Sequence, residues 1–160
     1  MRLSFSKIFA YVVLGVLTVF LSPLFVVVFV ADLAWGALLF CWWQICHGSN
    51  GRRWLAVYSD SAKWREHFEN VVLPLVGSEV VAVNISKVPT WRMSRSLERQ
   101  VHRHWGGREE HTPILIRFPW PVGRVTATRF YGAYLANAKT GASEELEQRL
   151  ARVQELVNES

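Results

Sequence analysis

The chain has 160 residues, of which 51% are hydrophobic, and a formal net charge of +5. These averages combine a long apolar N-terminal segment with a remainder of ordinary globular composition, which is long enough for one compact domain. Both cysteines lie in or next to the apolar segment, Cys41 within it and Cys46 directly after it, and this excludes a disulfide framework for the rest of the chain.

The apolar segment runs from Ile8 to Ile45 and contains one charged residue, Asp32. About 20 apolar residues already span a bilayer, so residues 1–50 are predicted to be a membrane anchor. The segment is also too long to be the apolar core of a cleaved signal peptide. We interpret Asp32 as a residue at the membrane boundary or a contact to another membrane protein.

Ser22-Pro23 divides the anchor, because serine caps helices and proline favours the first helical position. One arrangement is a hairpin of two helices, at about 5–21 and 23–46. The alternative is a single span from Ile8 to Val30, followed by an interfacial stretch from Trp35 to Trp43, because tryptophan favours the membrane boundary.

Basic residues flank the anchor on both sides, and their distribution predicts its orientation. Two precede it, and four follow it: Arg2 and Lys7, then Arg52, Arg53, Lys63 and Arg65. The hairpin places all of them on one side, and in a single span the downstream charges are the more numerous. Both counts predict that the domain is cytoplasmic. The membrane would be the inner or plasma membrane if the chain is bacterial. A signal-anchor orientation, the alternative, would place the domain outside.

The first elements after the anchor are two strands separated by a helix. A strand is predicted at residues 54–59, and Ser59-Asp60-Ser61 offers caps for a helix with apolar residues every three or four positions. These positions are Trp64, Phe68, Val72 and Leu75. Pro74 and Gly77 end the helix, and the apolar run at residues 80–85 predicts a central strand that is covered on both faces.

A second helix, a hairpin and a third helix follow. From Ser94 onward the apolar residues fall at steps of four, at Leu97, Val101 and Trp105, until Gly106-Gly107 ends the helix. The strands of the hairpin are predicted at 114–118 and 124–131. A polar loop with Asn137 and Gly141 then leads to a helix that is capped by Ser143 and buries Leu146, Leu150, Val153 and Val157.

The predicted fold is therefore α/β, in the order βαβαββα. Right-handed crossovers make the first two strands parallel, the last two strands form an antiparallel hairpin, and helices cover both faces.

This order, together with Thr112-Pro113 at the start of the third strand in "TPILIRF", resembles the thioredoxin-like superfamily over residues 51–160. The resemblance implies that Pro113 is a cis-proline facing the start of the first helix. It also implies a pair of redox cysteines at the end of the first strand, where this chain reads "YSDSAKWRE" and has none. Disulfide exchange needs a thiolate, so a non-redox member of the superfamily is expected.

The resemblance places candidate ligand-binding residues at that emptied position: Ser59, Asp60, Ser61, His111, Thr112 and Pro113. The serine hydroxyls and the histidine could bind a thiol ligand or carry out nucleophilic chemistry. The alternative is that Ser59, Asp60 and Ser61 only cap the helix, and the sequence favours this alternative.

A second candidate surface is basic. Arg95, Arg99 and Arg103 recur at steps of four, opposite the apolar stripe of the second helix, and would suit anionic lipid or a solvated face. Nucleic acid is disfavoured because Trp105 is needed in the core. The spacing of the histidines suggests no metal site, and no cofactor motif is present.

These features predict a membrane-anchored, non-redox thioredoxin-like domain that acts as an interaction or assembly module of a membrane complex. The membrane and a further membrane protein are the expected partners. The alternative is a protein or enzyme that binds a thiol ligand through Ser59, Ser61 and His111, and the missing cysteines disfavour an enzyme.

Overall fold

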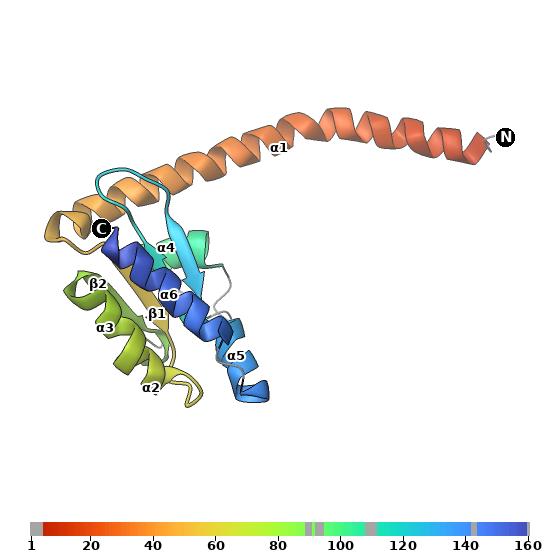
Figure 1. Cartoon of the computed structure of the whole chain (residues 1–160). Coiled ribbons are helices and arrows are strands. Elements are labelled where there is room, and N and C mark those ends of the chain that lie inside the picture. Colours follow the sequence, from red (N-terminus) through yellow and green to blue (C-terminus); the bar gives the residue numbers. More distant parts are fainter. Residues whose placement is uncertain (1–4, 89–90, 92–94, 108–111, 142–143, 160) are drawn as a thin grey trace. The chain divides into compact units, whose positions relative to one another are not determined.

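A computed structural model of the chain describes residues 5–88, 91, 95–107, 112–141 and 144–159. It divides into two compact units, Met1–Leu38 and Leu39–Ser160, and each is described by itself. The second unit holds a sheet with helices on both faces. The α/β prediction is therefore confirmed (Figure 1).

The apolar segment forms one continuous helix, α1 (Phe5–Cys46), with Pro23 inside it. Of the two predicted arrangements, the hairpin with helices at 5–21 and 23–46 is therefore not present, and the helix runs through Pro23 as in the single-span alternative. Pro23 cannot donate to the carbonyl of Val19, four residues earlier, but the Ser22 hydroxyl donates to that carbonyl at 3.1 Å. The serine therefore satisfies the acceptor that proline leaves free, and the helix continues.

In the first unit, the apolar side chains of α1 that the structure describes are exposed. Every residue from Leu24 to Val30 is more than half exposed. Among the described residues, one helix is long and apolar enough to cross a membrane, by length and composition, and the segment is Leu21–Asn50.

The sheet of the second unit contains β1 (Trp54–Tyr58), β2 (Val80–Asn84), β3 (Ile114–Arg117) and β4 (Thr126–Arg129), in the order β2-β1-β3-β4. β1 pairs parallel with β2 and antiparallel with β3, and β3 pairs antiparallel with β4. The predicted parallel pair and hairpin are thus present. β2 lies at an edge rather than in the centre, and Ala82 is exposed.

The segment after β1 contains α2 (Arg65–His67), a π-turn (Phe68–Val72) and α3 (Leu73–Val76). Its buried residues are Phe68, Val72 and Val76, so Val76 takes the place predicted for Leu75. A π-turn holds more residues per turn than an α-helix, and steps of four therefore remain on one face.

The second predicted helix is α4 (Leu97–Val101), which continues into a π-turn, His102–Gly106. Ser96 caps it, since the Ser96 hydroxyl accepts from the backbone N–H of Arg99 at 3.4 Å; the predicted start at Ser94 lies outside the described residues. Leu97 and Val101 are buried as expected.

The C-terminal part contains two helices where one was predicted. Residues 131–140 form α5 (Tyr131–Thr140) instead of the end of a strand and a polar loop. The final helix, α6 (Glu144–Asn158), is confirmed, although the predicted cap Ser143 lies outside the described residues. Leu146 and Val153 are buried as expected, together with Leu156.

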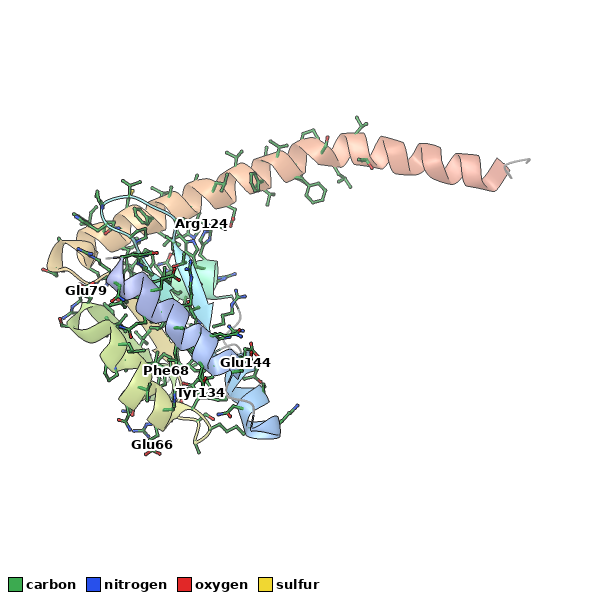
Figure 2. The ribbon with its side chains drawn as sticks, viewed as in Figure 1. Glu66, Phe68, Glu79, Arg124, Tyr134 and Glu144 are labelled. Atoms are coloured by element: carbon green, nitrogen blue, oxygen red, sulfur yellow. The ribbon has the colours of Figure 1, made fainter. Side chains whose placement is uncertain are left out.

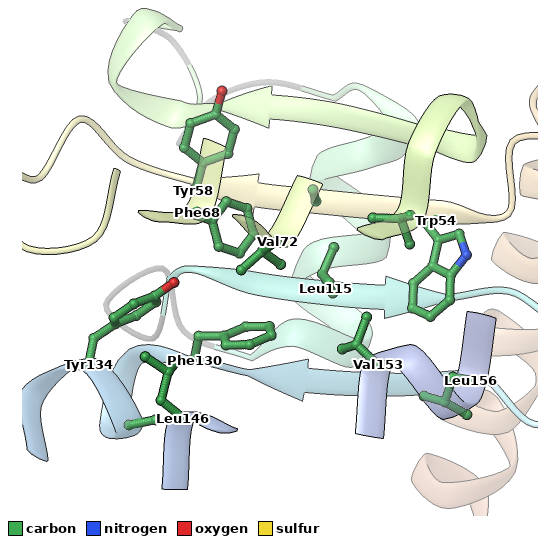
Figure 3. Close-up of a cluster of buried hydrophobic side chains, with 13 residues drawn as sticks. Trp54, Tyr58, Phe68, Val72, Leu115, Phe130, Tyr134, Leu146, Val153 and Leu156 are labelled. Atoms are coloured by element: carbon green, nitrogen blue, oxygen red, sulfur yellow. The ribbon is translucent and has the colours of Figure 1, made fainter. Parts of the chain in front are cut away.

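Two apolar cores lie on the two faces of the sheet, because side chains alternate along each strand. Trp54, Ala56 and Tyr58 of β1 face the first core, with α3, α5 and α6 (Figure 3). Leu55 and Val57 face the second core, which also contains α4 and the last turns of α1.

The last turns of α1 belong to the globular unit. Leu39 and Trp43 are buried in the second core, and the Trp43 ring stacks on Phe118 with centroids 4.5 Å apart. The Trp43 indole N–H donates to the carbonyl of Arg52 at 3.2 Å. Residues 39–50, which the sequence analysis assigns to the anchor, therefore pack with the domain.

Candidate functional site

The candidate ligand-binding residues Ser59, Asp60 and Ser61 follow the end of β1. The adjacent parallel strand β2 ends at Asn84, which is followed by Ser86. Because parallel strands end at the same edge of the sheet, these polar residues meet there.

Asp60 joins the two strand ends. The Asn84 side-chain amide donates to Asp60 Oδ1 at 2.7 Å, and the Asp60 backbone N–H donates to the Ser86 hydroxyl at 3.0 Å. Arg65 Nε lies 3.3 Å from the same carboxylate oxygen. The Asn84 side-chain oxygen accepts from the backbone N–H of Ser86 at 3.1 Å, so both ends of the buried amide are satisfied.

The two serines make local hydrogen bonds. The Trp64 indole N–H donates to the Ser59 hydroxyl at 3.3 Å, and the backbone N–H of Lys63 donates to the Ser61 hydroxyl at 3.4 Å. The Ser61 carbonyl accepts from the N–H of Arg65, the first residue of α2, at 3.0 Å. Ser61 therefore shapes the turn that leads into α2, as serines in such turns do.

The other candidates of this group lie at the start of β3. His111 is outside the described residues. Thr112 and Pro113 are buried, and the peptide bond between them is cis. The Pro113 carbonyl accepts from the N–H of Phe130 at 2.9 Å, which connects the start of β3 to the start of α5.

A shallow groove of about 380 Å³ adjoins the Ser61 turn, on the side of α2 away from the sheet. Its lining residues are Ala62, Lys63, Trp64, Glu66, His67, Asn70 and Val71. Figure 2 shows Glu66 directed away from the domain and Phe68 directed into it.

His67, which lines the groove, forms a pair with Tyr134. Sequence reasoning missed this pair of titratable side chains. His67 Nδ1 lies 2.8 Å from the Tyr134 hydroxyl. Burial lowers the pKa of His67 and raises the pKa of Tyr134. Both side chains are therefore neutral at pH 7.

The basic candidates do not form one uniform exposed row. Arg95 and Arg103 are exposed, whereas Arg99 is partly buried and its Nε has no hydrogen-bond partner among the described residues. Groups of three or more metal-ligating side chains are absent from the part of the chain that the structure describes. Cys41 and Cys46 are exposed free cysteines on α1.

Comparisons with family models, with curated proteins and with solved structures find no match to this chain.

Proposed function

We propose that this chain is a membrane-anchored, non-redox thioredoxin-like domain that serves as an interaction or assembly module in a membrane complex. The observation that carries the proposal is the hydrogen bonding of Ser59-Asp60-Ser61 at the end of β1. The resemblance would place redox cysteines there, but this loop holds groups that bond to Trp64, Asn84 and Ser86. The loop therefore serves the fold rather than a reaction.

The strand arrangement supports the thioredoxin-like assignment. A parallel pair comes first in the chain, an antiparallel hairpin comes later, and β1 joins the two halves by pairing with β3. Helices on both faces complete the arrangement that the βαβαββα order predicts. The additional helix α5 is a departure from that order.

The construction of the anchor supports an assembly role. The last turns of α1 pack into the second core through Leu39 and Trp43. The His47 ring, just after the helix, lies 3.1 Å from the carboxylate of Glu98 on α4. A membrane helix that continues into the core of its domain holds that domain next to the bilayer, where membrane partners are available. The charge distribution around the anchor favours the cytoplasmic side.

We place the partner surface at the groove beside Trp64 and His67. The groove lies beyond the C-terminal end of β1, whereas α1 enters the domain before the N-terminal end of β1. Within the domain, the groove is therefore at the end of the sheet away from the anchor. Trp64 gives the groove an aromatic group of the kind that is enriched at protein interfaces, and Lys63, Glu66 and Asn70 give it polar groups like those of an interface rim.

The experiment is native electrophoresis of the full chain after extraction of native membranes with a mild detergent. Asn70→Arg places a bulky cation in the groove, and Gln154→Arg makes the same change on an exposed position of α6 outside it. The proposal expects a larger assembly that Asn70→Arg weakens by about tenfold or more, equivalent to about 1.4 kcal/mol, and that Gln154→Arg leaves intact.

Ser59→Ala and Ser61→Ala provide a further arm of this experiment. If the serines serve only the fold, both variants retain the assembly. A protein that migrates as a single chain in every extract, or an assembly that both arginine variants affect equally, would contradict the proposal.

A further inference from the structure

The loop between β3 and β4 has an exposed apolar tip. Trp120 is 50% exposed and Val122 is 82% exposed, and both are within the seven-residue sequence from Pro119 to Val125. Exposed tryptophan next to an exposed aliphatic residue is unfavourable in water, because apolar surface remains hydrated. An apolar environment around the tip would therefore be more favourable than water.

The loop is fixed to the last turns of α1. The Gln44 side-chain amide donates to the Pro119 carbonyl at 2.9 Å, and Trp43 stacks on Phe118 at the base of the loop. Gly48 lies close to Trp120, since a Cβ atom at Gly48 would be 3.1 Å from the Trp120 ring. These contacts hold the tip beside the end of the helix.

The helix surface next to the loop is apolar as well. Gln44 and Gly48, four residues apart, face the loop, and Cys41 and Ile45 form the adjacent row on the helical geometry. Ile45 is 75% exposed and Trp42 is 47% exposed. Ile45, Trp120 and Val122 thus define an exposed apolar surface, which we call the juxtamembrane patch; Trp42, two positions before Gln44, lies on another side of the helix.

We propose that the juxtamembrane patch is a second membrane contact, in which Trp120 and Val122 insert into the interfacial layer of the bilayer at the C-terminal end of the α1 span. This inference rests on the membrane assignment of α1 in the proposed function. It adds a surface of the globular domain that binds lipid and fixes the orientation of the domain on the membrane.

Three observations select a bilayer as the occupant. The loop bonds to Gln44 and lies close to Gly48, and both residues belong to the segment Leu21–Asn50 that is long and apolar enough to cross a membrane. Tryptophan prefers the headgroup level, and Trp120 is at the tip of the loop. Arg124, exposed in the same loop and labelled in Figure 2, adds a positive charge next to the tip, which suits anionic headgroups.

The test uses the full chain in nanodiscs of phosphatidylcholine and phosphatidylglycerol, with Cys41→Ser and Cys46→Ser as background. A nitroxide is attached at one of three single cysteines: Val122→Cys at the loop tip, Val27→Cys in α1, and Ala62→Cys at the opposite end of the sheet. Collision with oxygen, which concentrates in lipid, and with a water-soluble nickel complex is measured at each site. Equal thermal melting of the three proteins controls for folding.

The proposal expects the labels at positions 122 and 27 to collide with the nickel complex severalfold less than the label at position 62, and with oxygen severalfold more. If position 27 is in lipid but position 122 is as accessible to the nickel complex as position 62, the inference is wrong, whereas the proposed membrane helix is supported. If position 27 is itself accessible to nickel, both the inference and the proposed membrane helix are wrong. Protection of position 122 in native membranes but not in nanodiscs would indicate a protein partner and would also overturn the inference.

Discussion

Asp60 links the ends of two parallel strands and is the most connected residue of the candidate site. Its carboxylate accepts from the amide of Asn84, which is buried, and lies beside the partly exposed guanidinium of Arg65. The two contacts differ in how much they contribute to the stability of the domain. An unsatisfied buried amide costs about 1–3 kcal/mol, whereas an exposed ion pair contributes about 0–1 kcal/mol. The hydrogen bond from the Asn84 side-chain amide should therefore account for most of the contribution of Asp60 to stability.

Two substitutions at Asp60 separate these contacts. Asp60→Ala removes the acceptor and should destabilise the domain by about 1–3 kcal/mol. Asp60→Asn keeps an oxygen for Asn84 and removes only the charge, so its effect should stay below about 1 kcal/mol. Thermal melting of the full chain in detergent, followed by near-ultraviolet circular dichroism, measures both. An equal loss of stability in the two variants would show that the ion pair with Arg65, not the hydrogen bond from Asn84, is the important contact.

His67 gives the domain a dependence on pH. Burial lowers the pKa of His67 below its ordinary value near 6.5, so the unfolded chain binds this proton more tightly than the folded chain. The contribution of neutral His67 to stability is present in full above pH 6.5. It is lost as the pH falls from there toward the folded-state pKa.

The variants His67→Gln and Tyr134→Phe test this dependence. The melting temperature of the unmodified chain should fall more steeply between pH 7 and pH 5 than that of His67→Gln. Tyr134→Phe removes the hydroxyl partner but keeps the buried imidazole, so it should keep the steep slope with a lower melting temperature throughout. Identical slopes in the unmodified chain and His67→Gln would exclude His67 as the origin.

At the scale of elements, the end of α1 has one buried face and one exposed face. Trp43 is buried in the second core, whereas the neighbouring Trp42 is about half exposed. The two residues are of the same type and adjacent in sequence. They therefore form a matched pair for measuring what the helix contributes to the domain.

Trp43→Ala should destabilise the globular domain by about 3–5 kcal/mol, because it removes a fully buried ring and leaves a cavity against Phe118. Trp42→Ala should leave the stability of the domain within about 0.5 kcal/mol, because it removes an exposed ring. Limited proteolysis and thermal melting of the full chain in nanodiscs report both. A comparable loss in the two variants would mean that Trp43 is not a core residue.

Elements with a strong pattern could be predicted from the sequence. The apolar runs of β1 and β3 and the stripe of α6 indicated buried strands and an amphipathic helix, and the structure contains them. α5 was missed because Phe130 and Tyr131 favour strands and Gly132 and Gly141 favour loops. The buried set of Phe130, Ala133 and Tyr134, at helical spacing, was the signal that could have revealed it.

The rest depended on contacts between distant parts of the chain. Ser22 compensates for Pro23 within the helix, which the sequence pattern alone presents as a helix start. The His67–Tyr134 pair joins residues far apart in sequence, and one of them was assigned to a loop. Ser59, Asp60 and Ser61 were predicted to cap the helix, but α2 begins only at Arg65 with Trp64 as its N-cap, and the partners of Asp60, Asn84 and Ser86, come from the next strand end.

At the scale of the whole molecule, the boundary between the candidate membrane-spanning helix and the globular domain lies inside α1. The compact unit begins at Leu39, and the last turns of the helix supply Leu39, Trp43 and Gln44 to the domain. The anchor therefore cannot be separated from the domain at the end of the helix without opening the second core.

The most direct test of this central claim compares two fragments, 39–160 and 51–160, in the same mild detergent. The larger fragment should unfold cooperatively. The smaller lacks Leu39 and Trp43, whose loss costs several kcal/mol of the roughly 5–15 kcal/mol that stabilise a typical domain. It should melt at least about 10 °C lower or lose cooperative unfolding. Equal melting temperatures for the two fragments would contradict a domain that begins inside α1.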